Sequence, residues 1–170
     1  MIEKIDRYYL EILSNDNFKK KSKPSKDYFI ELIDPANFEI NKFFYKQIGK
    51  KYQWVDRLSW INSDWIKYIT NKNLKTFILK KENDLVGYFE LILKNETNES
   101  EIAYLGILEE YFQKGCGGYL LSEAIKKSFD LGAKRVWVHT CSLDHPNAIN
   151  NYKSRGMKIF KTEILKRKAV

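Results

Sequence analysis

Three apolar segments joined by short polar turns lie in the middle of the chain and constrain its fold more than any other feature. They span 76–79, 85–93 and 101–108 and are rich in branched and aromatic residues. The joining turns, 82–84 and 94–99, are strongly polar. Consecutive hairpins have this pattern, because strand-forming runs alternate with turn-forming clusters. The sequence therefore predicts an antiparallel meander at the centre of the molecule.

After the meander the pattern alternates between helix and strand. A helix is predicted over 118–131, because apolar residues recur on one face and a glycine follows. A buried strand over 135–140 comes next, and this strand–helix–strand step implies a parallel neighbour. A final helix is predicted to start near 144–146 and to stop at Gly156, before a last strand over 157–164.

The part of the chain before the meander is expected to supply a strand and two helices. A strand over 28–33 precedes Asp34-Pro35, an N-cap residue with proline at the first helical position. The helix that follows is expected to close at Gly49, and a second helix covers 63–70. Its expected inward face consists of Trp65, Ile66 and Ile69.

Together these elements predict an α/β (α+β) fold with a mixed, mostly antiparallel central sheet of about six to seven strands and helices on both faces. One domain is expected over 1–170, with 1–27 less certain as an N-terminal extension. Periodicity does not decide whether 8–13 form a strand or a helix.

Composition excludes several classes of protein. With 44% hydrophobic and 15% aromatic residues, the chain can build a core and does not resemble a disordered protein. It has neither an apolar run of membrane-spanning length nor a signal-like start, so we expect a cytoplasmic protein with no membrane partner. Cys116 and Cys141 form neither a disulfide framework nor a zinc site, so no metal is expected.

The net charge of +8 is compatible with nucleic acid, an anionic membrane or an anionic ligand. Most cations are scattered lysines, whereas arginine, the better reader of nucleic-acid grooves, is rare. We therefore expect no nucleic-acid partner. The densest basic run, 19–26, is interpreted as a solvated loop.

A glycine-rich turn between the meander and the next helix is the clearest functional signal. Gly115, Gly117 and Gly118 allow positive φ and close approach of a ligand to the backbone. The helix start adds unpaired N–H groups and the positive end of a dipole, which suit a phosphate or pyrophosphate. Tight strand–helix turns also use glycine for steric reasons alone. The turn is neither a Walker loop nor a usual Rossmann loop, because it lacks Gly-Lys-Ser/Thr and follows an antiparallel strand.

The segment 111–121 resembles motif A of the GNAT acetyltransferase superfamily, which runs Gln/Arg-x-x-Gly-x-Gly/Ala and binds the pyrophosphate of acetyl-CoA. Ala148, Tyr152 and Gly156-Met157 resemble motif B, usually Ala-x-x-x-Tyr-x-x-x-Gly-Phe. The order of elements matches the family from about Tyr28 to Glu163.

More narrowly, 54–58 and 139–146 look like a bacterial subgroup whose acceptor is unknown. The resemblance implies an enzyme, an acetyl-CoA-dependent N-acyltransferase that moves an acetyl group to a primary amine of a small molecule or peptide. Such an enzyme would be a monomer or a homodimer.

Four positions depart from the family pattern. Phe112 stands where Gln or Arg is usual, and Gln113 comes one place late. His145 stands where the family often has Asn around the pantetheine arm, and Met157 replaces Phe. The backbone of the turn is unaffected by these changes, and an imidazole can replace an amide as donor or acceptor.

The resemblance also implies where acetyl-CoA binds. The strand over 104–108 should splay from the strand over 136–140 and present its edge to the pantetheine. The expected cofactor contacts are Leu105, Ile107, Gln113, Lys114, Gly115, Cys116, Gly117, Gly118, His145 and Asn147. A thiol pKa falls at a helix start, but the family uses the position of Cys116 only as backbone.

Direct attack of an amine on a thioester needs an acid for the leaving thiolate and a base for the amine. Tyr152 occupies the family's acid position, and its alternative role is packing between helix and sheet. Glu90 and Tyr104, together with Glu101, are candidate bases. The alternative for Glu90 is a solvated carboxylate on the wet face of the sheet.

The acceptor is expected near Trp54, Asp56 and Arg57, which alternatively lock the first two helices together. His139 ends the parallel strand beside the expected cleft and is a candidate for binding the acceptor or acting as a base, whereas its alternative role is that of a core histidine satisfied by backbone. Two other functions stay open from the sequence, a non-catalytic acyl-CoA-binding regulatory module and a nucleic-acid-binding domain.

Overall fold

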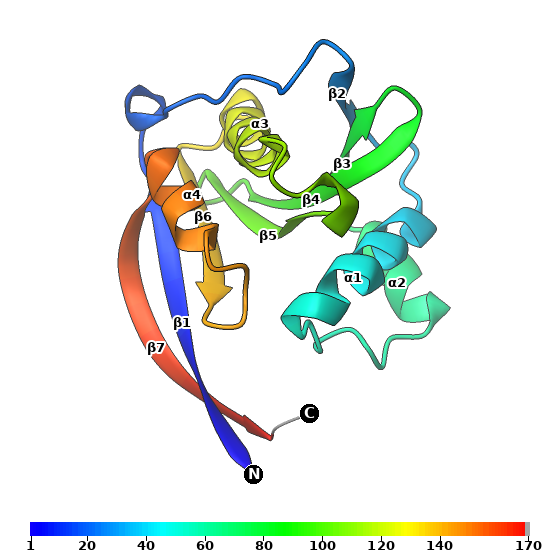
Figure 1. Ribbon diagram of the computed structural model, residues 1–170, viewed down its shortest axis with the longest axis vertical. Coiled ribbons are helices and arrows are strands. Elements are labelled where there is room, and N and C mark those ends of the chain that lie inside the picture. The colour runs from blue at the N-terminus through cyan, green and yellow to red at the C-terminus, as the bar shows by residue number, and fades with distance from the viewer. Residues whose placement is uncertain (169–170) are drawn as a thin grey trace.

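The computed structural model describes residues 1–168 and shows a seven-stranded sheet with helices on both faces (Figure 1). The strands are β1 (Ile2–Ile12), β2 (Tyr28–Leu32), β3 (Leu74–Lys81), β4 (Asp84–Lys94), β5 (Glu99–Ile107), β6 (Arg135–Cys141) and β7 (Lys158–Lys168). The helices are α1 (Phe38–Tyr52), α2 (Asn62–Ile69), α3 (Cys116–Asp130) and α4 (Ala148–Ser154). Spatially the sheet runs β2-β3-β4-β5-β6-β1-β7, which confirms the expected mixed, mostly antiparallel fold.

The predicted meander is present as β3, β4 and β5. Ile78 on β3 lies opposite Tyr88 on β4, and Phe89 lies opposite Leu105 on β5, all in antiparallel register. The next strand, β6, pairs with β5 in parallel, as the strand–helix–strand pattern predicted.

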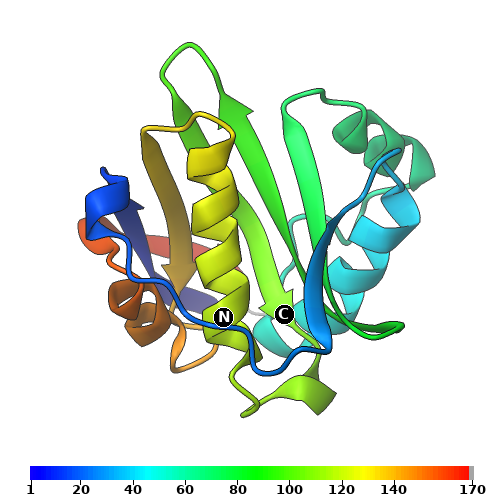
Figure 2. The ribbon, with the colours of Figure 1, turned by 90° about the horizontal axis from the view of Figure 1, so that it is seen from above.

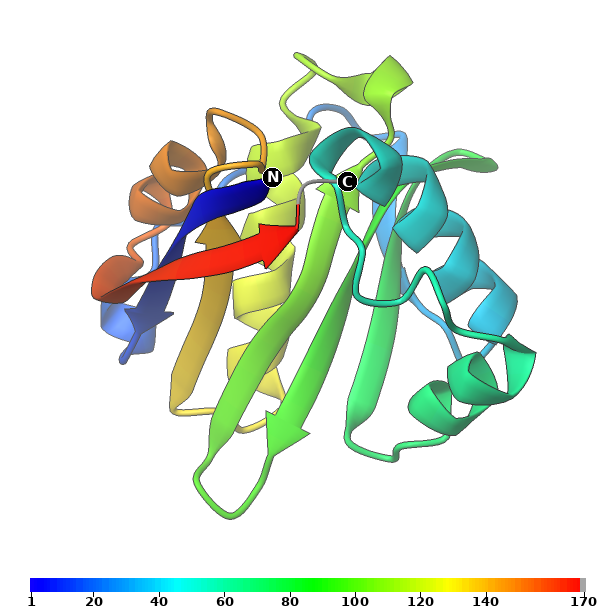
Figure 3. The ribbon, with the colours of Figure 1, turned by 90° about the horizontal axis from the view of Figure 1, so that it is seen from below.

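Side chains alternate between the two faces of this sheet and so separate two apolar clusters. Ile78 and Tyr88 pack with Phe44 of α1, whose ring is stacked on Tyr88 with centroids 4.8 Å apart. Their neighbours Phe77 and Phe89 belong to the cluster that α3 covers. Figure 2 shows α3 lying across one face of the sheet, and Figure 3 shows α1 and α2 from the other side.

The first strand lies inside the sheet rather than beside it. β1 pairs antiparallel with β6 on one edge and with β7 on the other. Leu10 and Ile12, both on β1, are fully buried at 0% and 2% exposure. The residues that periodicity left undecided are therefore strand, and the segment 13–27 has to cross the molecule to reach β2.

The boundaries predicted for the first helix are wrong at both ends. Asn37 is the N-cap, and its side chain accepts a hydrogen bond from the N–H of Glu39 at 3.0 Å, so the helix starts at Phe38 rather than at Pro35. Gly49 lies within the helix, and a Cβ there would be 2.7 Å from Trp54 Cβ. That glycine permits close packing, and the helix ends later, where Gln53 takes the left-handed conformation at φ 54°.

The expected inward face of α2 is only partly correct. Trp65 is fully buried, but Ile66 is 45% exposed and Ile69 is half-buried. This short helix packs chiefly through the single indole. Within residues 1–168, no helix is both long and apolar enough to cross a membrane.

The parallel pairing of β5 and β6 is short, and its end opens the molecule. The register joins Glu99 to Arg135 and extends only to Glu101 and Trp137. Beyond that point the two strands run apart, as Figure 3 shows. The expected splay is thus confirmed, and the backbone of β5 beyond Glu101 no longer pairs with β6.

Candidate functional site

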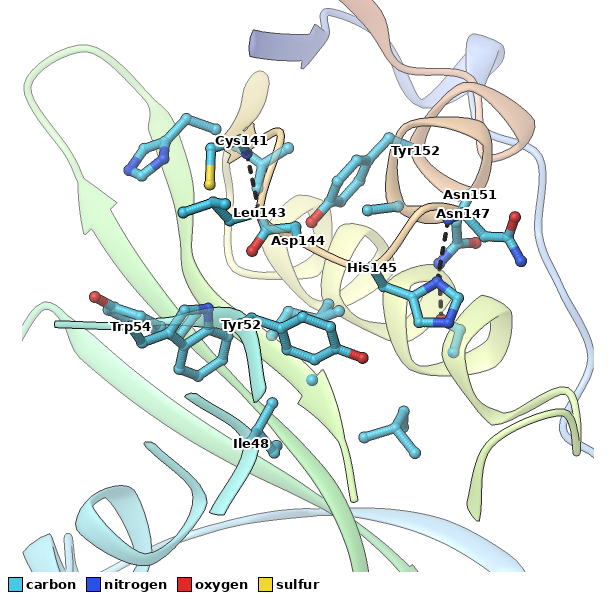
Figure 4. A pocket seen from close by; sticks show the side chains of 18 of the residues that line it. Ile48, Tyr52, Trp54, Cys141, Leu143, Asp144, His145, Asn147, Asn151 and Tyr152 are labelled. Carbon is cyan, nitrogen blue, oxygen red and sulfur yellow. Dashed lines mark hydrogen bonds between the residues drawn. The ribbon is translucent and has the colours of Figure 1, made fainter. Parts of the chain in front are cut away.

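The parted strands border a cavity of about 810 Å³. Its walls come from β5, β6, the start of α3, the loop before α4 and the end of α1, part of which Figure 4 shows. The predicted site residues that line it are Trp54, Asp56, Tyr104, Leu105, Ile107, Gln113, Gly115, Cys116, Gly117, Gly118, His139, His145, Asn147 and Tyr152. Glu90, Arg57 and Lys114 are not among its lining residues.

The glycine turn leaves the N-terminus of α3 open toward this cavity. Gln113 and Gly115 have φ of 61° and 77°, which a glycine tolerates at no steric cost and the glutamine adopts less readily. A Cβ placed on Gly117 would meet only Asn151 Nδ2, at 4.0 Å. The first N–H groups of a helix have no partner within it, so this turn can offer donors to a phosphate group.

Asn151 was not predicted, although it supports this turn directly. Its Nδ2 donates to the carbonyl oxygen of Gly117 at 3.2 Å, and the residue lines the cavity. An asparagine within a helix gives no signal in the sequence, and only the approach of α4 to α3 makes it part of the site.

A second unpredicted group points to a polar ligand. The hydroxyl of Tyr52, which also lines the cavity, is buried without a hydrogen-bond partner among the described residues. Burial raises the pKa of this phenol, so it is a protonated donor at neutral pH. A buried donor of this kind is costly unless something satisfies it.

Tyr152 lies on α4 with its ring in the core and its hydroxyl toward Asp144 (Figure 4). Burial, and then the charge of Asp144, raise the pKa of this phenol well above its usual value. The Asp144 carboxylate is itself held by Thr140 Oγ1 at 2.5 Å and by the N–H of Cys141 at 3.0 Å. The phenol therefore stays protonated at neutral pH and can donate a proton into the cavity.

Tyr104 does not have the properties of a base. Its hydroxyl donates to Asp56 Oδ2 at 3.2 Å, and burial raises its pKa. Trp54 packs its ring against Tyr104 with centroids 4.8 Å apart. The acceptor region thus presents an exposed carboxylate, Asp56, flanked by two aromatic rings.

Glu90 is neither the expected base nor the alternative solvated carboxylate, because it is completely buried in an ion pair. Arg57 Nη1 and Nη2 donate to its two oxygens at 3.2 and 3.1 Å. The Tyr68 hydroxyl donates at 2.6 Å and Asn41 Nδ2 at 2.8 Å. A carboxylate with all these donors has no free lone pair directed at the cavity.

Arg57 accordingly locks the helices instead of binding an acceptor. It is 6% exposed, and its guanidinium carbon lies 4.0 Å from the ring centroid of Tyr68 and 4.3 Å from that of Tyr104. Burial opposes its charge, but Glu90 outweighs that cost and keeps the pKa above its usual value. The sequence left open whether this cluster binds the acceptor or locks the first two helices together. Arg57 locks the helices, whereas Trp54 and Asp56 line the cavity.

His139 is half-buried on β6, beside β1. Burial, and then the charge of Arg7, lower its pKa from 6.5, so the imidazole is neutral at pH 7. It is thus able to accept a proton. Arg7 also lines the cavity and was missed, because the sequence did not place the first strand in the sheet.

Two other residues of the glycine turn have side chains with close neighbours in the protein. Cys116 is 1% exposed, and burial raises the pKa of its thiol where a helix start was expected to lower it. It is therefore an unreactive thiol. The ammonium group of Lys114 lies 5.4 Å from the ring centroid of Tyr111.

Comparisons with known proteins agree with this arrangement. A family model described as "Acetyltransferase (GNAT) family" matches residues 34–157. No curated protein matches the chain.

Solved structures resemble the chain over most of its length. A GCN5-related N-acetyltransferase from Sphaerobacter thermophilus matches 96% of this chain and 51% of its own, with TM-score 0.73 and 15% identity. The chain therefore spans about half the length of that protein. At this identity the likeness shows the fold alone.

Two smaller proteins match over a larger share of their own length. An aminoglycoside acetyltransferase from an uncultured soil metagenomic sample matches 78% of this chain and 90% of its own, with TM-score 0.64 and 17% identity. A Bacillus subtilis acetyltransferase in complex with CoA matches 76% of this chain and 75% of its own, with TM-score 0.57 and 20% identity.

Proposed function

The chain belongs to the GNAT acetyltransferase family, and from this premise we propose that it moves an acetyl group from acetyl-CoA to a primary amine of a small molecule or peptide. One observation carries the proposal: an open helix start, a parted strand edge and a protonated tyrosine all face the same cavity. The aminoglycoside acetyltransferase among the structural neighbours supports an amine on a small molecule.

The cofactor half of the cavity fits acetyl-CoA. The N–H groups at the start of α3 would hold its pyrophosphate, because Gly117 leaves that approach open. The edge of β5 at Leu105 and Ile107 would pair with the pantetheine amides. His145 Nδ1 accepts the N–H of Asn147 at 3.1 Å, which leaves Nε2 as the donor that replaces the family's usual amide.

The other half of the cavity supplies the proton transfers. Bound acetyl-CoA supplies a thioester carbonyl as the electrophile. Asp56 would hold the acceptor ammonium, and His139, neutral at pH 7, would take its proton. The amine nitrogen then bonds to the carbonyl carbon while the carbon–sulfur bond breaks, and the second proton on nitrogen passes to water. Tyr152 would give its proton to the departing sulfur and recover one from water.

Calorimetric titration tests the proposal at the level of binding. The protein is titrated with acetyl-CoA and, separately, with adenosine 3′,5′-bisphosphate. We expect micromolar affinity for acetyl-CoA and at least about tenfold weaker binding of the nucleotide fragment, since the fragment cannot use the β5 edge. Absence of acetyl-CoA binding contradicts the proposal.

An amine panel scored by release of free thiol tests the reaction itself. The expected result is thiol release that requires both acetyl-CoA and one class of amine. If acetyl-CoA binds but no amine, amino acid or peptide releases thiol, the chain is a non-catalytic acyl-CoA-binding module instead.

A further inference from the structure

The connection between the first two strands follows an unusual course. β1 lies between β6 and β7, whereas β2 forms the opposite edge of the sheet. The chain between them therefore crosses the molecule on the side of α3, as Figures 1 and 2 show. The lysine run over 19–26 lies in this connection, and we call it the basic crossing.

Hydrogen bonds fix the basic crossing beside the glycine turn. The N–H of Lys21 donates to Ser122 Oγ on α3 at 2.9 Å, and the N–H of Lys19 donates to the carbonyl of Arg155 at 3.0 Å. This is not the freely solvated loop that the sequence indicated, because its backbone is attached to the middle of α3 and to the end of α4.

The crossing also approaches the open helix start closely. A Cβ on Gly118 would lie 3.3 Å from Lys21 Cγ, so the stem of this lysine runs along the first turn of α3. A Cβ on Gly115 would lie 4.0 Å from Pro24 Cγ. Both glycines line the cavity, so the crossing lies next to its glycine end, although none of residues 19–26 lines it.

The crossing carries positive charge that no carboxylate neutralises. All of its lysines are exposed, and none of them has an acidic partner within 4.0 Å among residues 1–168. Asp16 and Asp27, just outside its two ends, form no ion pair with it. The lysines of the crossing are Lys19, Lys20, Lys21, Lys23 and Lys26. Such a cluster of positive charge beside a cavity attracts anionic ligands.

We infer that the basic crossing binds the 3′-phosphate of the acetyl-CoA nucleotide. The inference rests on the proposed function, which places the pyrophosphate at the start of α3. The 3′-phosphate is on the ribose next to that pyrophosphate and carries close to two negative charges at neutral pH. Lys21, whose stem lies beside Gly118, reaches this neighbourhood, and Lys23 precedes Pro24, which lies beside Gly115.

Comparing CoA with 3′-dephospho-CoA isolates this phosphate, because the two ligands differ in no other group. At low salt we expect the unaltered protein to bind CoA about tenfold more tightly, as several exposed ion pairs of modest strength would produce. The difference should shrink as salt is added, because exposed charges are screened.

A charge-removing variant locates the effect in the crossing. Lys20→Gln/Lys21→Gln/Lys23→Gln should weaken CoA binding about tenfold and leave 3′-dephospho-CoA binding unchanged. The control, Lys67→Gln/Lys72→Gln/Lys94→Gln, removes the same charge from exposed positions that do not line the cavity, and it should retain the full difference. Thermal unfolding monitored by circular dichroism checks that both variants fold.

The contrary outcomes are distinct. Equal affinity of the unaltered protein for the two ligands overturns the inference without any variant. A difference that survives in the triple variant overturns it as well, and both results leave the proposed function intact. If neither ligand binds the unaltered protein, the proposed function itself fails.

Discussion

Tyr152 and His139 face one cavity with pKa values displaced in opposite directions by the same cause. Burial raises the pKa of the phenol and lowers that of the imidazole. In both cases the neutral form is favoured, because a buried charge loses its hydration. The site therefore presents a protonated donor and an unprotonated acceptor together at neutral pH.

Replacement of Tyr152 by phenylalanine separates its catalytic role from its packing. The ring stays in the core, but the proton donor is lost. We expect turnover to fall about a hundredfold, the lower range for general acid catalysis, with acetyl-CoA affinity within about threefold. Thiol-release kinetics and calorimetry measure the two quantities. Unchanged turnover removes the acid role from Tyr152.

His139 makes the stability of the protein depend on pH. Its folded-state pKa lies below 6.5, so as the pH falls through 6.5 the unfolded chain binds a proton before the folded one does. Stability should therefore be complete above that pH and decrease below it. Urea unfolding on both sides of pH 6.5 should show a smaller loss for His139→Gln than for the unaltered protein. An identical loss in the two proteins contradicts the shift.

At the scale of elements, the site depends on how α3 begins and on how the first two helices attach to the sheet. The glycine turn is a local pattern, so the sequence predicted its place between β5 and α3. The attachment of the helices was not predictable in the same way. Arg57 and Glu90 are 33 residues apart, and no local spacing reveals that they pair in the core. The start of α1 was also mispredicted. Asn37 caps the helix, whereas the sequence indicated Asp34 as the cap and Pro35 as the first helical residue.

Gly117→Val tests the helix start. The Cβ of the added side chain meets no atom of residues 1–168 closer than 4.0 Å, but the side chain occupies the approach to the N–H groups. We expect acetyl-CoA affinity to fall at least about tenfold, with the free energy of unfolding changed by less than about 1 kcal/mol. Glu123→Val, on the same helix away from the cavity, is the control and should bind normally. Normal acetyl-CoA affinity in Gly117→Val would contradict binding of the pyrophosphate at the start of α3.

Glu90→Leu tests the buried ion pair. It leaves the charge of Arg57 buried without its partner, which should lower the free energy of unfolding by about 3–5 kcal/mol. The exposed pair between Lys126 and Asp130 is the control, and Asp130→Asn should cost only about 0.5 kcal/mol. Urea denaturation measures both. A Glu90→Leu variant of normal stability but without turnover would restore Glu90 as a catalytic residue.

At the scale of the whole molecule, the position of β1 within the sheet could not be predicted from the sequence. Its residues show strand-like and helix-like features equally, and its partners β6 and β7 come from the far end of the chain. Most other elements were predicted because neighbours in sequence pair with one another, as in the meander. For the same reason the sequence did not predict that Arg7 lines the cavity, because this residue reaches the cavity only through the position of β1 in the sheet.

Leu10→Ala tests whether β1 belongs to the core. Leu10 is 0% exposed, so truncation should lower the free energy of unfolding by about 2–5 kcal/mol. Leu13, which is 60% exposed just after the strand, is the matched control, and Leu13→Ala should change little. Chemical denaturation compares the two variants. Equal stabilities would mean that the first strand is dispensable.

The pairing of β1 also determines when the protein can fold during its synthesis. β1 leaves the ribosome long before its partner β7, because Ile2 pairs with Lys168 and Leu10 with Ile159. The edge of β1 that faces β7 therefore stays unpaired until residues 158–168 have emerged. Contacts of such sequence separation form slowly, and open strand edges invite association with other chains. A nascent chain of this fold is thus most in need of chaperone protection in the interval before its last strand appears.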